Sequence, residues 1–192
     1  VLVIIDGAAQ DFRMSNLLDT GADAILVSGQ KYLAGPTSGL VLGKTELIDA
    51  IRAQEKGIRP GMKPPKEAVL GAFAALKFRQ QINMDDWTSE QKRKVARFIS
   101  KANKINGVIA EAQPDPTNLP FDRAHLRFTR SSLLPDATQV AASLRSGQPS
   151  IWVMDHLAHQ SEIVFELVQV SNDEMDTILD RLSELMAPNE TT

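Results

Sequence analysis

The chain has 192 residues, of which 43% are hydrophobic and 23% charged, as in an ordinary globular protein. Its 21 basic and 24 acidic residues leave a net charge of -3, so we expect no nucleic-acid or membrane partner. Cysteine is absent, which excludes disulfide and thiolate chemistry and fits a cytoplasmic protein, and no apolar run reaches the roughly 20 residues that cross a bilayer.

Two short apolar runs open the chain. Residues 1–6 end on Asp6, and residues 24–27 lead into Ser28 and Lys31. Both runs are rich in branched residues, which predicts buried parallel strands whose carboxyl ends carry an acid and an amine. A parallel sheet needs more strands than these, so we expect the chain to be the C-terminal half of a protein. The missing N-terminal half of the same protein would then be a partner that contributes to the site.

A third strand is expected at residues 40–42, antiparallel because its connection is too short for a crossover. Helices should follow, the first with Thr45 as its N-cap and the second with Val69, Ala72, Phe73 and Leu76 on its apolar face. The expected helical ranges are 45–57, 66–80 and 89–104.

The composition changes near Gly107, where a small α+β domain is expected to begin. Strands are predicted at 108–112 and 124–128, a hairpin at 151–154 and 163–170, and helices after Asp136 and Ser171. The predicted fold class is therefore α/β. We expect a large-domain part at 1–84, a linking helix at 85–106 and a small C-terminal α+β domain at 107–192.

The residues at the two strand ends point to pyridoxal 5'-phosphate. A lysine can form a Schiff base with the cofactor's carbonyl, and a nearby carboxylate can hold its ring nitrogen protonated. Lys31 and Asp6 supply these groups, the Ser28 hydroxyl can bind a phosphate, and Ala8 is small enough to lie under a flat ring. The alternative is an ordinary turn at a strand end.

Several segments resemble the selenocysteine synthase-like family of fold-type I pyridoxal phosphate enzymes, in particular its D-glucosaminate-6-phosphate ammonia-lyase branch. The resemblance covers nearly the whole chain. The family usually has an acidic residue or glycine where Ala34 stands. The segments that carry the resemblance are Asp6-Gly7-Ala8-Ala9-Gln10, Ser28-Gly29-Gln30-Lys31, residues 35–44, Met62-Lys63, residues 66–71, Arg123-Ala124 with Phe128, and residues 147–151.

The resemblance implies a fold-type I large domain followed by a small domain, in a homo-oligomer with shared active sites. It implies a pyridoxal phosphate-dependent ammonia-lyase that acts on an amino acid or amino-sugar acid such as D-glucosaminate 6-phosphate. Lys31 would be the catalytic residue. Asp6, Ala8 and Ser28 would also bind the cofactor.

Two arginines are candidate substrate-binding residues. Arg59 can hold a carboxylate or phosphate with its planar fork of donors, although a loop salt bridge explains it equally well. Arg123, on a predicted strand, is a weaker candidate with a structural alternative. His156 and His159 have a metal-like spacing but no third ligand, so no metal is predicted.

Other functions fit the same residues. A selenocysteine synthase-like or cysteine desulfurase-like transferase would use the same lysine and aspartate. A tRNA-directed member should show a basic face, which the net charge of this chain does not suggest. A non-catalytic family member would keep the fold for assembly alone.

Overall fold

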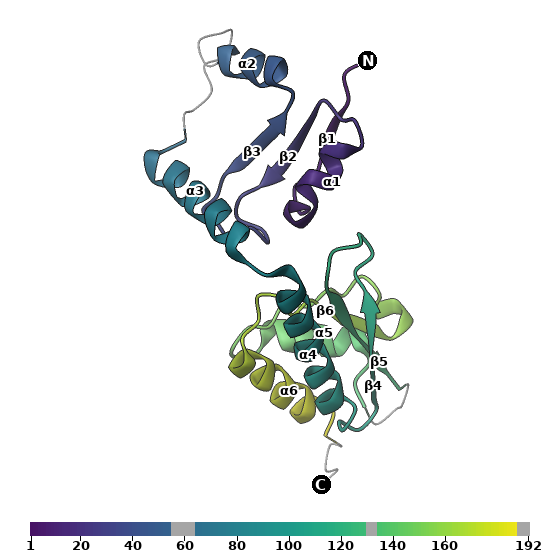
Figure 1. Ribbon diagram of the computed structural model, residues 1–192. Helices are drawn as coiled ribbons and strands as arrows, with labels where there is room; N and C mark the ends of the chain where they lie inside the picture. The colour runs from purple at the N-terminus through teal and green to yellow at the C-terminus, as the bar shows by residue number, and fades with distance from the viewer. Residues whose placement is uncertain (55–63, 130–133, 188–192) are drawn as a thin grey trace. The chain divides into compact units, whose positions relative to one another are not determined.

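The computed structural model describes residues 1–54, 64–129 and 134–187 of the chain. The chain forms two compact units, Val1–Asn83 and Met84–Thr192, which we call unit 1 and unit 2 (Figure 1). Within the described residues, every helix is too short or too polar to cross a membrane.

Unit 1 is built on a sheet of order β1-β2-β3, in which β1 runs parallel to β2 and β3 antiparallel to it. Both directions confirm the prediction. Helices come before β2 and after β3. The elements in chain order are β1 Ile4–Asp6, the 3-10 helix η1 Asp11–Arg13, α1 Met14–Asp19, β2 Ala24–Ser28, β3 Gly39–Gly43, α2 Thr45–Ala53 and α3 Lys66–Gln81.

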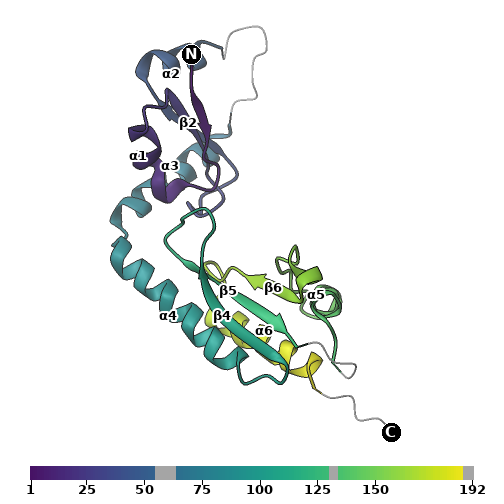
Figure 2. The same cartoon turned by 90° about the vertical axis from the view of Figure 1, so that its right-hand side faces the viewer.

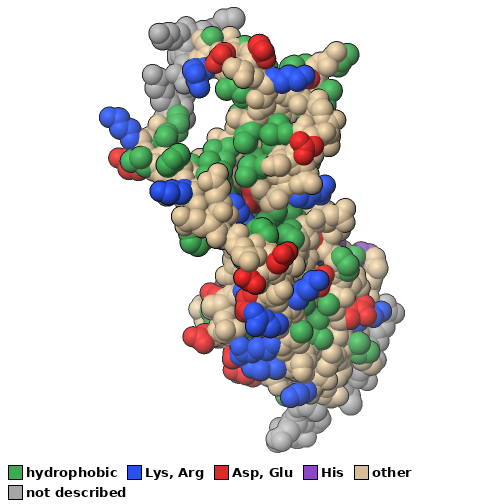
Figure 3. All heavy atoms as spheres, in the orientation of Figure 1, with side chains coloured by type: hydrophobic (Ala, Val, Ile, Leu, Met, Phe, Trp, Pro, Cys, Tyr) green, Lys and Arg blue, Asp and Glu red, His purple; other side chains and the backbone are tan. Residues whose placement is uncertain are grey.

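The two faces of the unit 1 sheet differ in burial. One face packs against α1, where Ile25 and Val27 of β2 are almost fully buried. The other carries Ile4, Leu26 and Val41, which are 40–50% exposed although they are apolar. Figure 3 shows hydrophobic side chains at the surface of this unit. The prediction that the first strand is buried is therefore wrong for this chain, because β1 is an edge strand.

Helix α3 begins and ends close to the predicted residues, but its predicted apolar face is only partly buried. Ala68 and Ala72 are buried, whereas Val69 and Phe73 are 53% and 67% exposed. Small side chains lie inward because the loop between β2 and β3 comes very close: a Cβ on Gly71 would lie 2.8 Å from Pro36 Cγ. The predicted N-cap of α2 is also displaced, since Lys44 is the cap and Thr45 the first helical residue.

Unit 2 consists of an antiparallel sheet of order β4-β5-β6 with α4, α5 and α6 packed around one hydrophobic core (Figure 2). Alternate residues of β5, namely Ala124, Leu126 and Phe128, point into that core. The elements are α4 Met84–Ala102, β4 Val108–Pro114, β5 Asp122–Phe128, α5 Ala137–Ser146, the 3-10 helix η3 Ala158–Gln160, β6 Glu162–Phe165 and α6 Asn172–Leu185.

Local signals in unit 2 predicted the starts of α5 and α6. Asp136 and Ser171 are N-caps of α5 and α6, and each forms a capping box with the residue three positions later. Helix α4 begins earlier than predicted, at Met84, with Asp85 and Asp86 in its first turn, where acidic residues favour a helix. Its residues Val95, Phe98 and Ala102 lie in the core of unit 2.

The predicted hairpin at 151–154 and 163–170 is only partly correct. Met154 forms an isolated bridge with Val164, and β6 ends at Phe165. Residues 151–153 form no strand. The chain between Met154 and β6 is occupied by η3 and a left-handed residue, Ser161, so continuous pairing does not develop.

Candidate cofactor site

The candidate site in unit 1 begins where β1 and β2 end. Asp6 pairs with Leu26 in the parallel register. The pairing continues beyond the strands, since Gly7 N donates to Leu26 O at 2.9 Å and Ser28 N donates to Ala8 O at 3.0 Å. These hydrogen bonds hold Asp6, Ala8 and Ser28 at one edge of the sheet. In open α/β sheets, ligands bind at the carboxyl ends of the strands.

The Asp6 side chain is exposed, and its position is fixed locally. Its Oδ1 accepts a hydrogen bond from Ala8 N at 3.1 Å. This contact orients one carboxylate oxygen toward the chain that follows β1. An exposed, oriented carboxylate at a sheet edge can hold a proton on a ring nitrogen of a bound molecule.

Lys31 lies in a compact turn between β2 and β3, and its side chain is exposed. Three backbone hydrogen bonds close this segment. Gly29 N donates to Ser38 O at 2.8 Å, Gly35 N donates to Gly29 O at 2.8 Å, and Ala34 N donates to Lys31 O at 2.9 Å. Lys31 therefore lies in a defined turn at the same end of the sheet as Asp6 and Ser28, where β1 and β2 have their carboxyl ends. We call residues 29–35 the lysine turn.

The lysine turn depends on close backbone approaches. A Cβ on Gly29 would lie 2.0 Å from Ser38 Oγ, and one on Gly35 would lie 3.1 Å from Ala75 Cβ of α3. Ala34 has a positive φ of 56°, the left-handed region that favours glycine. Residue size and backbone conformation are thus tightly constrained on both sides of Lys31.

Helix α3 holds the lysine turn with a buried arginine that the sequence patterns did not single out. Arg79 Nη2 lies 2.7 Å from Asp11 Oδ2 of η1 and donates to the backbone carbonyl of Tyr32, the residue after Lys31. Burial raises the pKa of Asp11, against the opposing charge of Arg79, and burial lowers the pKa of Arg79. The available signal was spacing, since Arg79 continues the inward stripe of Ala68, Ala72 and Ala75.

The donor set in unit 1 fits pyridoxal phosphate. An amine, a carboxylate and a hydroxyl, from Lys31, Asp6 and Ser28, come from two neighbouring strand ends and the turn beyond them. Lys31 would attach the cofactor, Asp6 would face its ring nitrogen, Ser28 would donate to its phosphate, and Ala8 would lie under its ring.

The two candidate arginines lie elsewhere. Arg59 falls outside the described residues. Arg123 is on β5 in unit 2, where its Nη2 lies 2.5 Å from Oδ2 of the fully buried Asp115 and its Nη1 lies 3.4 Å from Met154 Sδ. Burial would raise the pKa of Asp115, but hydrogen bonds from the side chain and backbone of Thr117 and the charge of Arg123 hold it below its usual value.

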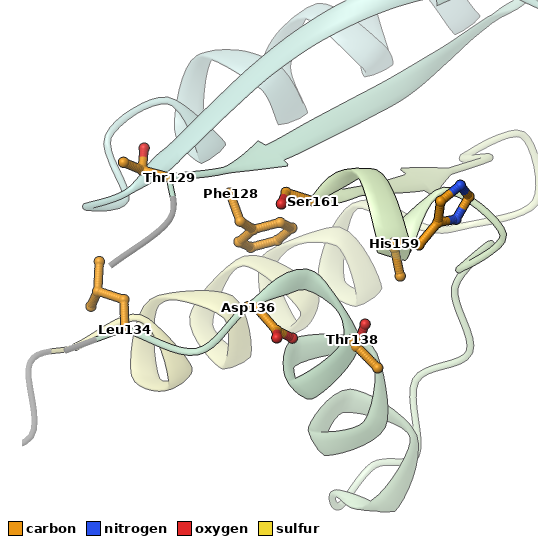
Figure 4. Close-up of a pocket in the computed structure, with 8 residues that line it drawn as sticks. Phe128, Thr129, Leu134, Asp136, Thr138, His159 and Ser161 are labelled. Carbon is orange, nitrogen blue, oxygen red and sulfur yellow. The ribbon is translucent and has the colours of Figure 1, made fainter. Parts of the chain in front are cut away.

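A pocket of about 290 Å³ in unit 2 contains none of the predicted site residues (Figure 4). Asp136 and Thr138 border it from the start of α5, and His159 and Ser161 from η3 and its C-cap. The Asp136 carboxylate already accepts a hydrogen bond from Gln139 N in the capping box. In the described parts of both units, no group of three or more histidine or acidic side chains could hold a metal ion.

No protein-family model matches the chain. It is 30% identical over 186 residues to the 5'-C-glycyluridine monooxygenase-decarboxylase of a Streptomyces species, covering 97% of this chain and 46% of the relative. It is 32% identical over 183 residues to the D-glucosaminate-6-phosphate ammonia lyase of Salmonella typhimurium, covering 95% and 48%. The chain thus spans about half the length of these relatives.

A solved structure of a D-glucosaminate-6-phosphate ammonia-lyase matches with a TM-score of 0.78 and 29% identity, over 97% of this chain and 49% of that one. The chain is therefore a homologue of this lyase, and its fold is that of the fold-type I pyridoxal phosphate enzymes. The predicted fold class and the resemblance are confirmed.

Proposed function

We propose that the protein is a pyridoxal phosphate-dependent ammonia-lyase that acts on a phosphorylated amino-sugar acid such as D-glucosaminate 6-phosphate. The observation that carries this proposal is the placement of Asp6, Ser28 and the lysine turn at one edge of a parallel strand pair. The sequence and structural similarity to a lyase of that name supports it.

When bound, the cofactor withdraws electrons from the substrate's Cα and so weakens the bond to its proton. Lys31 Nζ holds the cofactor and then accepts the Cα proton as a general base. The Asp6 carboxylate holds the proton on the ring nitrogen, and Ser28 Oγ orients the phosphate. Each role uses a polar group at the described edge of the sheet.

The reaction on a 2-amino-3-hydroxy acid balances with water alone, because the one water that it consumes replaces the one that it releases. After loss of the Cα proton, the hydroxyl on the next carbon leaves as water. The resulting enamine takes up one water and releases ammonia and a 2-keto-3-deoxy acid. Arg59, which lies outside the described residues, is the candidate group for the substrate's carboxylate or phosphate, since guanidinium binds either as a planar fork. Arg123, the weaker candidate, already pairs with the buried Asp115 in unit 2.

The chain spans about half of its relatives, so further parts of the site come from outside these residues in this proposal. A second half of the large domain would complete the phosphate site, and a second subunit would share each active site. We place the protein in the cytoplasm, in line with the absence of cysteine from these 192 residues.

Oxygen-dependent decarboxylation is a second candidate reaction. One observation favours it: the monooxygenase-decarboxylase relative is nearly as similar in sequence as the lyase. The two reactions use the same cofactor site in our proposal but release different products. A lyase releases ammonia and a keto acid without oxygen, whereas a monooxygenase-decarboxylase consumes oxygen and releases carbon dioxide.

The test uses the full-length protein loaded with pyridoxal phosphate. We expect D-glucosaminate 6-phosphate to give equal amounts of ammonia and keto acid under nitrogen, and Lys31→Ala to lose both this activity and the bound cofactor's absorbance. Lys44→Ala is the matched control, because Lys44 pairs with Asp23 at the opposite end of the sheet. Turnover by Lys31→Ala, or product formation only with oxygen, would contradict the proposal.

A further inference from the structure

Arg79 makes three contacts around the lysine turn. Its Nη2 lies 2.7 Å from Asp11 Oδ2 and donates to the Tyr32 carbonyl oxygen. Its guanidinium carbon lies 4.1 Å from the centre of the Phe12 ring, which in turn lies 5.8 Å from the Tyr32 ring. One side chain from α3 thus connects η1 with the residue that follows Lys31.

The connection is buried. The Asp11 side chain is 1% exposed and that of Arg79 is 13% exposed. Moving two charges out of water is unfavourable, and a well-packed apolar pair is often as stable as a buried ion pair. The contribution of this ion pair to the stability of unit 1 is therefore not sufficient to explain why the pair is present.

The hydrogen bonding of the pair is also incomplete. Among the described residues, both carboxylate oxygens of Asp11 and Nη1 of Arg79 are buried without a hydrogen-bond partner, although Oδ2 takes part in the ion pair. Apolar residues could fill the same space without this cost. They could not, however, donate a hydrogen bond to the Tyr32 carbonyl, which is the contact that reaches the lysine turn.

Two further contacts of α3 with this segment are steric. Ala75 lies against Gly35, and Gly71 lies against Pro36, at distances that leave no room for larger groups. These contacts limit how far the turn can move toward α3. The hydrogen bond from Arg79 fixes the carbonyl group of Tyr32, the residue after Lys31, in direction as well as in distance, because a hydrogen bond depends on angle.

We propose that Arg79, anchored by Asp11, is a positioning residue that fixes the direction of Lys31 through the Tyr32 carbonyl. This inference rests on the proposed function for the role of Lys31. A buried ion pair that is distant from Lys31 in sequence thus holds the reacting amine in the position that catalysis requires. Misplacement by about 1 Å can lower a rate roughly 100-fold.

The first test needs no cofactor. Site-specific incorporation of 3-fluorotyrosine at position 32 of the full-length protein reports on the lysine turn by fluorine NMR. We expect one narrow resonance in the wild type. Arg79→Lys and the apolar pair Asp11→Leu with Arg79→Met should give a broadened or second resonance, while circular dichroism stays unchanged.

The second test uses the loaded enzyme. For Arg79→Lys we expect cofactor that is still trapped on Lys31 by borohydride, a shifted pH midpoint of its absorbance, and a kcat reduced about tenfold or more with KM within about twofold. Arg97→Met is the control, because Arg97 forms a half-exposed pair with Asp176 in unit 2. It should leave all these quantities unchanged.

The outcomes separate this inference from the proposed function. If wild-type protein traps no cofactor on Lys31, the proposed function fails whatever the Arg79 variants do, and the fluorine spectra still test the turn. If the variants are folded and keep the wild-type resonance, pH midpoint and kcat, Arg79 is not a positioning residue. Should both Arg79 variants unfold, the milder Asp11→Asn, which keeps the size of the side chain, must produce the same changes or the inference is wrong.

Discussion

Gly29 N donates a hydrogen bond to Ser38 O at 2.8 Å, and a Cβ on Gly29 would lie 2.0 Å from Ser38 Oγ. The two residues therefore close the segment that carries Lys31 at the ends of β2 and β3. Since Pro36 O would also lie 3.2 Å from that Cβ, rotating the serine side chain alone does not make room.

Gly29→Ala should destabilise unit 1 by roughly 1–3 kcal/mol, the usual cost of forcing an extra methyl group into a tight site. Native-state hydrogen exchange of the β2 and β3 amides measures this loss. Gly39→Ala is the control, because a Cβ there would meet nothing within 4 Å, and it should change stability by no more than about 0.5 kcal/mol. Equal effects of the two substitutions would contradict the steric argument.

Ala34→Gly should increase the stability of the lysine turn by about 0.5 kcal/mol. The left-handed conformation costs an alanine about 1–2 kcal/mol, and the extra freedom of glycine in the unfolded chain cancels part of the gain. Ala53→Gly, at the end of helix α2, should instead cost about 0.5–1 kcal/mol. Hydrogen exchange of the amides at 29–35 and 45–54 compares them, and a loss of similar size at both positions would refute the prediction.

Much of the fold could be predicted because its signals are local. The parallel direction of β1 and β2, the antiparallel return of β3 and the capping boxes at Asp136 and Ser171 all follow from short segments of sequence. The placement of Asp6, Ala8 and Ser28 at one edge then follows from the parallel pairing. Their roles stay predictions.

The features that the sequence did not predict depend on contacts between distant residues. Asp11 and Arg79 meet through the packing of η1 and α3, and neither belongs to a motif of its own. The apolar side chains of α3 suggested an inward face that included Phe73, but the close approach of Pro36 to Gly71 selects the alanine face instead. The spacing of apolar residues predicts a helix, but it does not say which face of the helix packs against a tight loop.

Asp6→Asn should lower kcat about 100-fold or more in the full-length enzyme while the cofactor stays attached to Lys31. The asparagine oxygen can still accept the hydrogen bond from Ala8 N, so the local shape is kept, but the charge that holds the ring nitrogen protonated is lost. Rates and borohydride-trapped cofactor are measured on the same samples. Asp19→Asn, on the exposed end of α1, is the control, and a similar kcat in both variants would remove Asp6 from the site.

Asp115 should make unit 2 sensitive to acid. Its folded-state pKa lies below the unfolded value of about 3.9, so the ionised carboxylate stabilises the fold above about pH 4, and this stabilisation is lost as the pH falls through the folded-state pKa. Asp115→Asn leaves Arg123 without its charged partner and should cost about 3–5 kcal/mol at pH 7. The difference from wild type should shrink below pH 4.

The measurement is the free energy of unfolding from hydrogen exchange of the β5 amides between pH 3 and 7, corrected for intrinsic exchange rates. Asp180→Asn, which changes an exposed carboxylate on α6, should remain within about 0.5 kcal/mol of wild type at every pH. If the lost stability came from packing alone, the difference in the free energy of unfolding between Asp115→Asn and wild type would not change with pH. Such a result would mean that the charge of Asp115 does not stabilise the loop before β5.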